Sequence, residues 1–162
     1  MIAVLDSNAV IGFAKGECLE LICALFQQVL IPPVVRREVI EEGAGRPGAR
    51  ELLGALGAWA EERPPVGKSL DLGMPAVNAD DHQVLALAVE TSALLVTDDA
   101  VLRREAERQG ILAMGTVETV LLLKRRQALP AVKPVLDLMQ ARGYHVEPTL
   151  YAQALQLAGE TA

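Results

Sequence analysis

The chain has 162 residues, of which 51% are hydrophobic and only 3% aromatic, and its formal net charge is −6. This length suits one domain with its own core, and a core of Leu, Val, Ile and Ala is typical of parallel sheets covered by helices. The negative charge argues against a protein that coats nucleic acid, because such proteins neutralise phosphates with a basic face. It does not exclude an enzyme whose acidic side chains hold cations.

The hydropathy of the chain indicates a protein that stays out of membranes. No apolar run approaches the roughly 18 residues that are needed to cross a bilayer. The opening apolar run is interrupted by Asp6 before the core of a signal peptide could form. We therefore expect a cytoplasmic location.

The first third of the chain alternates strand-like and helix-like segments. Residues 2–5 predict a buried strand that stops at the polar turn 6–8. A helix is predicted over 17–28, a second strand over 29–31, and a helix over 34–42. Strand, helix and strand together make a βαβ unit.

The middle of the chain continues this alternation after one irregular stretch. A helix is predicted from 49 to about 59, and residues 61–78 collect prolines and glycines that predict a surface excursion. Helix 79–90, strand 94–97 and helix 98–109 follow. The alternation predicts the α/β class, with a parallel sheet covered on both faces.

The remainder contains a weak strand and a helical tail. Residues 111–114 predict the strand, and residues 116–158 predict three helical pieces separated by Pro130, Gly143 and Pro148. Tyr144 and Tyr151 of the tail are too scattered to form a base-stacking platform, so we interpret them as packing residues.

Acidic residues stand where a parallel sheet would bring them together. Asp6 follows the first strand and Asp98 and Asp99 follow the third, and ligand sites in open parallel sheets lie beyond these strand ends. Glu38 lies one to two turns after the second strand, and Asp81 opens a helix. Mg²⁺ prefers carboxylate oxygens, and a two-metal site about 3.5–4 Å wide needs several acids. We therefore expect these carboxylates to converge.

Each acid also has a simpler interpretation. Asp81 and Asp98 suit the first turn or N-cap of a helix, where an acid stabilises by about 0.3–1 kcal/mol, and Glu38 suits a solvated helix surface. Asp6 is different, because an acid next to four apolar strand residues is partly desolvated and needs a partner.

Four ordered motifs carry a resemblance to a known family, and they cover most of the chain: Val4-Leu5-Asp6-Ser7-Asn8, then Ile31-Pro32-Pro33 with Val35 and Glu38-Val39, then Asp81 with Val84, Ala86 and Ala88, then Leu95-Val96-Thr97-Asp98-Asp99. The tail adds Gly115-Thr116, Leu121-Leu122, Lys124, Val132-Lys133-Pro134, Leu136-Asp137, Gly143 and Ala158-Gly159-Glu160. Together these residues resemble PIN-domain proteins (the VapC-like ribonuclease superfamily), in particular the prokaryotic group with a helical C-terminal tail.

The resemblance implies a PIN-like three-layer α/β/α fold with a central parallel sheet. It implies a single domain over 1–162, in which 1–115 form the core sheet and helices and 116–162 form a helical tail packed on them. It further implies that Mg²⁺ or Mn²⁺ is held by Asp6, Glu38, Asp81, Asp98 and Asp99, with Asp6, Glu38, Asp81 and Asp99 catalytic. Ser7, Asn8 and Thr97 would orient ligands or water, although turn and capping chemistry explains them equally well.

By the same resemblance we expect an endoribonuclease that hydrolyses phosphodiester bonds of RNA, acts as the toxin of a toxin–antitoxin pair, meets a small antitoxin protein and forms a homodimer. One alternative is a non-catalytic PIN-like nucleic-acid-binding or scaffold module. A phosphotransfer domain on a similar sheet is disfavoured, because no second acid stands two residues after Asp6 and no Lys ends a late strand.

Overall fold

The computed structural model describes residues 1–66 and 77–161. Within them, five parallel strands form one sheet, in the order β3 (Ala60–Glu62), β2 (Gln28–Ile31), β1 (Ile2–Leu5), β4 (Leu94–Val96), β5 (Ala113–Met114). In the register of the central strand, Val4 lies opposite Leu30 on one side and Leu95 on the other. The strand order reverses between β1 and β4, so their carboxyl ends flank a topological switch point, where open α/β sheets place ligand sites.

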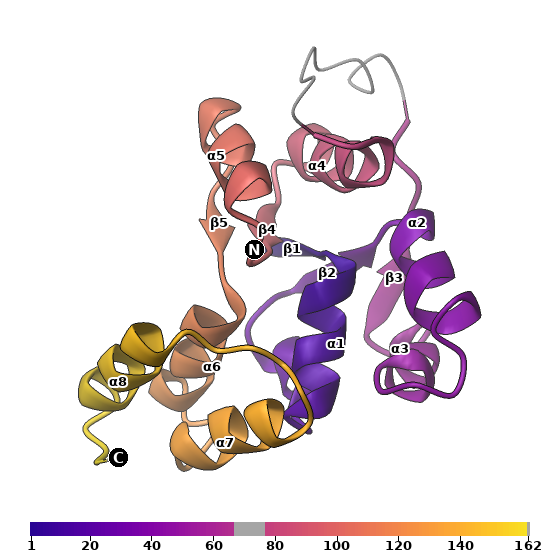
Figure 1. Ribbon diagram of the computed structural model, residues 1–162. Helices are drawn as coiled ribbons and strands as arrows, with labels where there is room; N and C mark the ends of the chain where they lie inside the picture. Colours follow the sequence, from indigo (N-terminus) through magenta and orange to yellow (C-terminus); the bar gives the residue numbers. More distant parts are fainter. Residues whose placement is uncertain (67–76, 162) are drawn as a thin grey trace.

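Helices cover both faces of this sheet and make the predicted three layers (Figure 1). On one side lie α4 and α5, and on the other α1 and α6 (Figure 1). The helical segments are α1 (Ser7–Lys15), the 3₁₀ helix η1 (Leu19–Ala24), α2 (Pro33–Arg36), the π-helical turn η2 (Arg37–Glu41), α3 (Ala49–Ala55), α4 (Ala79–Thr91), α5 (Ala100–Arg108), α6 (Thr116–Arg125), α7 (Lys133–Ala141) and α8 (Pro148–Leu157). In the described ranges, no helix is both long and apolar enough to span a bilayer.

The first helix corrects the sequence-based prediction. A polar turn was predicted at 6–8 and a helix over 17–28. Instead, α1 begins directly after β1, and only the short η1 lies within 17–28. Asp6 caps α1 by accepting a hydrogen bond from the N–H of Ala9 at 2.7 Å. The helix buries Val10 and Phe13 against the sheet, and it ends before Glu17, whose φ of 55° turns the chain.

The edge strand β3 was also missed. It lies inside the stretch interpreted as helix and surface excursion, and it pairs with β2 through Val29 and Ala60. The preceding helix α3 ends at Ala55, and Gly57 at a φ of 82° then reverses the chain into β3. The predicted excursion over 61–78 falls largely on residues 67–76, which lie outside the described residues.

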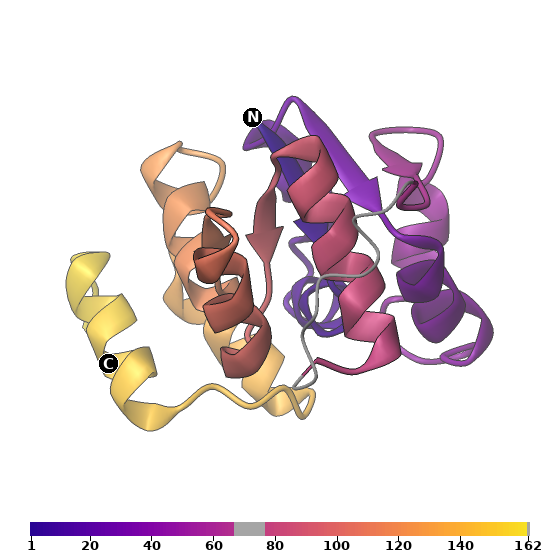
Figure 2. The ribbon, with the colours of Figure 1, turned by 90° about the horizontal axis from the view of Figure 1, so that it is seen from above.

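The other predicted strands and the three-part tail are confirmed. The tail packs on the sheet domain by joining its core: Val120 and Leu123 of α6 and Leu136 of α7 belong to the same buried cluster as β1. Figure 2 shows α8 outermost, beyond α6. Glu160 fixes the end of the chain, because its carboxylate accepts hydrogen bonds from Lys124 Nζ at 2.7 Å and from the N–H groups of Val132 and Lys133 at 2.8 and 2.9 Å.

Candidate active site

Asp6 is the buried acid at the switch point. Its side chain is only 7% exposed, and its Oδ2 accepts a short hydrogen bond from the hydroxyl of Thr97. Burial raises the pKa of Asp6 to about 6, although the hydrogen bonds from Thr97 and from the Ala9 N–H lower it, and the negative charges of Asp98 and Asp81 raise it further. The structure thus brings acids from three separate segments within electrostatic range of one another.

Thr97 links the buried acid to the loop after β4. Its side chain is fully buried, donates to Asp6 and accepts a hydrogen bond from the N–H of Asp99 at 3.1 Å. The hydroxyl therefore ties the end of β1 to the loop after β4. Ser7 and Asn8 differ, because their side chains make no hydrogen bond with any residue that the structure describes.

The pair Asp80 and Asp81 opens α4, and the two carboxylates point to different neighbours. Asp80 forms an ion pair with Arg37 Nη2 at 3.2 Å. Asp81 is half-buried and accepts a hydrogen bond from Asn78 Nδ2 at 3.0 Å, while Asn78 caps the helix. Burial raises the pKa of Asp81, as do the charges of Asp99 and Asp80. Asp81 has no cationic partner among the described residues.

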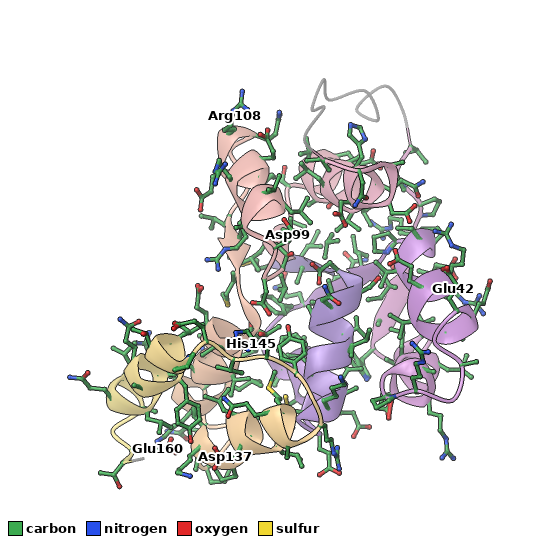
Figure 3. All side chains as sticks on the ribbon, viewed as in Figure 1. Glu42, Asp99, Arg108, Asp137, His145 and Glu160 are labelled. Carbon is green, nitrogen blue, oxygen red and sulfur yellow. The ribbon has the colours of Figure 1, made fainter. Side chains whose placement is uncertain are left out.

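Asp99 faces the same space as Asp81. It caps α5 by accepting the N–H of Leu102 at 2.9 Å, and Figure 3 shows it at the start of that helix. Asp81 and Asp99 both line a small cavity of about 150 Å³ together with Val77, Asn78, Val101 and Leu102. The second acid of each pair is thus the one that borders this cavity.

Asp98 is turned the other way, toward the tail. Its Oδ1 accepts the N–H of Thr116 at 2.9 Å, and its Oδ2 accepts the Thr116 hydroxyl at 2.7 Å and a short hydrogen bond from the hydroxyl of Tyr144. Sequence reasoning missed these two partners, because they lie 18 and 46 residues away in the chain. No local pattern signals such contacts.

Glu38 lies at the periphery of the acidic group. It stands on η2 and is half-buried, and burial raises its pKa, with further contributions from the charges of Asp80 and Asp81. It borders a different cavity, of about 410 Å³, with Lys15 and Arg46. Asp81 is therefore the residue through which Glu38 is linked electrostatically to the acids at the switch point.

The negative charge of these acidic residues suits a hard divalent cation, but their side chains are spread apart. In the described ranges, no three Asp, Glu, His or Cys side chains stand close enough together to hold a metal ion in their present orientations. No ion pair with any described residue neutralises Asp6, Glu38, Asp81, Asp98 or Asp99. Burial and nearby negative charges raise the pKa values of Asp6, Glu38 and Asp81, and a bound Mg²⁺ or Mn²⁺ would offset this negative charge.

Comparison with known proteins gives the family. The family model DUF3368, a PIN domain, matches residues 2–160. No curated protein matches the chain. Among solved structures, a PilT N-terminus domain protein from the hyperthermophilic archaeon Sulfolobus solfataricus P2 is 16% identical, with a TM-score of 0.48, over 91% of this chain and 98% of that one.

A second solved structure, VapBC2 from Rickettsia felis bound to a DNA fragment from the promoter, is also 16% identical. It has a TM-score of 0.50 and the match covers 71% of this chain and 98% of that one. At this identity the likeness speaks for the fold alone, which agrees with the parallel sheet order and the helical layers. The family model spans nearly the whole chain, and the protein therefore belongs to the DUF3368 family of PIN domains.

Proposed function

We propose that this protein is a Mg²⁺- or Mn²⁺-dependent endoribonuclease. The observation that carries the proposal is the set of acidic side chains around the switch point: none forms an ion pair with a described residue, and burial and neighbouring negative charges raise the pKa values of Asp6, Asp81 and Glu38. The neighbouring Asp80, in contrast, is paired with Arg37. Acids that stay unpaired next to a buried carboxylate are expected at a site that takes up cations.

Within this site the side chains would have different tasks. Asp6, Asp81 and Asp99 would hold the cation, and Glu38 would approach from η2. Thr97 keeps the Asp6 carboxylate in one orientation through its hydroxyl. When bound, a divalent cation at this place would supply water activation at neutral pH and neutralise charge on the phosphodiester.

The biological setting is part of the proposal. Membership of the PIN family and the likeness to VapBC2, which was solved bound to promoter DNA, support a role as the toxin of a toxin–antitoxin pair with a small antitoxin partner. We also propose a cytoplasmic location, RNA as the substrate and a homodimer. Residues 1–115 and 116–162 are proposed to fold as a single domain.

The direct test is cleavage of a labelled RNA by the purified protein after treatment with EDTA and after addition of Mn²⁺. We expect cleavage only with the metal, and loss of cleavage in Asp6→Asn, since Asn still accepts the cap hydrogen bond of α1 but lacks the charge. Asp80→Asn serves as the matched control, because that acid is paired with Arg37. Equal cleavage by wild type and Asp6→Asn would contradict the nuclease proposal and favour the scaffold alternative.

A further inference from the structure

Tyr144 connects the C-terminal tail to the edge of the candidate active site. It follows α7, and Figure 3 labels its neighbour His145 on the segment between α7 and α8. Its hydroxyl donates a short hydrogen bond to Asp98 Oδ2 and lies 3.5 Å from the hydroxyl oxygen of Thr116. A residue of the tail thereby reaches the loop that carries Asp98 and Asp99.

The ring of Tyr144 packs directly on α1. A Cβ atom at Gly12 would lie 2.8 Å from Cε2 and Cζ of the ring, which is closer than such atoms approach one another. Gly12 stands on the helix that Asp6 caps. The ring and the hydroxyl of Tyr144 thus contact two of the elements that build the site.

Asp98 accepts three hydrogen bonds from the tail. Two come from Thr116 and one from Tyr144, so that both carboxylate oxygens have a partner. Gly115 permits this approach, because a Cβ atom there would lie 2.8 Å from Asp98 Oδ1. The neighbouring acid Asp99 accepts one hydrogen bond, from Leu102, and borders the cavity with Asp81.

We infer that Asp98 is the docking point of the tail and that Tyr144 is a positioning residue of the active site, which holds Asp98 away from the cation that Asp6, Asp81 and Asp99 would share. The inference rests on the proposed function, since it divides tasks among the acids of the same site. The tail is then part of the site. Tyr144 acts through its hydrogen bond to Asp98.

Loss of the Tyr144 hydroxyl should strengthen metal binding. With the hydroxyl of Tyr144 removed, the Asp98 carboxylate keeps only its bonds to Thr116 and can rotate toward Asp6, whose pKa its charge already raises. An extra negatively charged oxygen strengthens binding of a hard cation, because affinity follows the number of charged ligands. The same oxygen disturbs the arrangement needed for catalysis.

Calorimetric titration with Mn²⁺ tests this. We expect Tyr144→Phe to bind Mn²⁺ about threefold or more tightly than wild type, and Asp98→Asn to reverse the gain in the double variant. Tyr151→Phe is the matched control, because that tail tyrosine donates in the same way to Asp137, away from the site. Asp99→Asn should weaken binding several times more than Asp98→Asn.

Two results would overturn the inference: a Tyr144→Phe variant with the Mn²⁺ affinity of wild type, or an Asp98→Asn variant that loses as much affinity as Asp99→Asn. The docking of Tyr144 on Asp98 is tested separately by the free energy of unfolding in EDTA. The destabilisation of the double variant should be less than the sum for Tyr144→Phe and Asp98→Asn. Additive losses would contradict docking. A wild type that binds no Mn²⁺ would contradict the proposed function, while the unfolding result would still decide whether Tyr144 docks on Asp98.

Discussion

The hydroxyl of Thr97 donates a hydrogen bond to the Oδ2 atom of Asp6, across the switch point between the first and fourth strands. Both side chains are buried, and the other oxygen of Asp6 caps α1. One carboxylate thereby joins the end of β1, the start of α1 and the loop after β4. The most desolvated acid of the candidate site is also one of its structural connections.

Replacement of Thr97 tests the structural part of this role. Thr97→Val keeps the shape but removes the donor and leaves a buried carboxylate oxygen unsatisfied, which costs about 1–3 kcal/mol of unfolding free energy. Thr97→Ser keeps the hydroxyl and should lose less. Urea denaturation in EDTA measures both variants. Equal stability of the two would show that the hydrogen bond contributes little.

Gly12 offers a test in which two effects predict opposite signs. In an exposed helix, Gly→Ala stabilises by up to about 1 kcal/mol. At Gly12 the new methyl group would meet the ring of Tyr144, so we expect Gly12→Ala to destabilise by about 1–3 kcal/mol through overpacking. Gly54 of α3 has open space around it and is the control, for which Ala should stabilise. A stabilised Gly12→Ala protein would mean that the ring does not pack there.

Asp80 and Asp81 are adjacent in the chain, but their replacement should change the affinity for Mn²⁺ to different extents. Asp81→Asn should weaken Mn²⁺ binding by at least about tenfold, since even the loss of a group that supports a metal ligand costs that much. Asp80→Asn removes only an exposed ion pair with Arg37 and should bind almost as wild type does. Calorimetry of both variants measures the difference. The opposite order would exchange the two assignments.

Glu160 makes the tail sensitive to acid. Burial alone would raise its pKa, but hydrogen bonds from Lys124 and from the N–H groups of Val132 and Lys133 lower it below the ordinary value of 4.5. Its contribution to stability is therefore complete above pH 4.5 and is lost as the pH falls through the lowered pKa.

At pH 7, Glu160→Gln should cost about 1.5–3 kcal/mol, the range for hydrogen bonds to charged groups. The difference in unfolding free energy between wild type and this variant should shrink below pH 4.5. Urea denaturation at several pH values measures it. A difference that stays constant down to pH 3 would show that the carboxylate charge is not what stabilises the tail.

Much of the architecture could be predicted from local sequence. The strands β1, β2 and β4 are apolar runs that end at polar residues, and they were placed correctly within about one residue. Two elements were missed for local reasons. Helix α1 was missed because its cap is the same acid that ends β1, so one residue marks both the end of the strand and the start of the helix. Strand β3 was missed because it buries only Ala60 of its three residues.

The candidate site was predictable only in part. Strand ends indicated where Asp6 and the later acids would meet, and motif spacing favoured Asp81 and Asp99, but sequence alone did not decide which member of each acidic pair points inward. Asp98 and Asp99 are adjacent in the chain, but Thr116 and Tyr144 from the tail hold only Asp98, while Asp99 caps α5. Such partners are brought together by tertiary packing, which periodicity and spacing do not encode.

We propose that carboxylates from distant segments share a divalent cation at the switch point. The decisive measurement is a crystal structure of the protein soaked in Mn²⁺, with data collected to record the anomalous scattering of manganese. We expect an anomalous peak at a manganese ion bound by Asp6, Asp81 and Asp99, with Asp98 still hydrogen-bonded to Thr116 and Tyr144. Manganese absent from these carboxylates under conditions that saturate the protein, or manganese bound by Asp98 in place of Asp99, would contradict it.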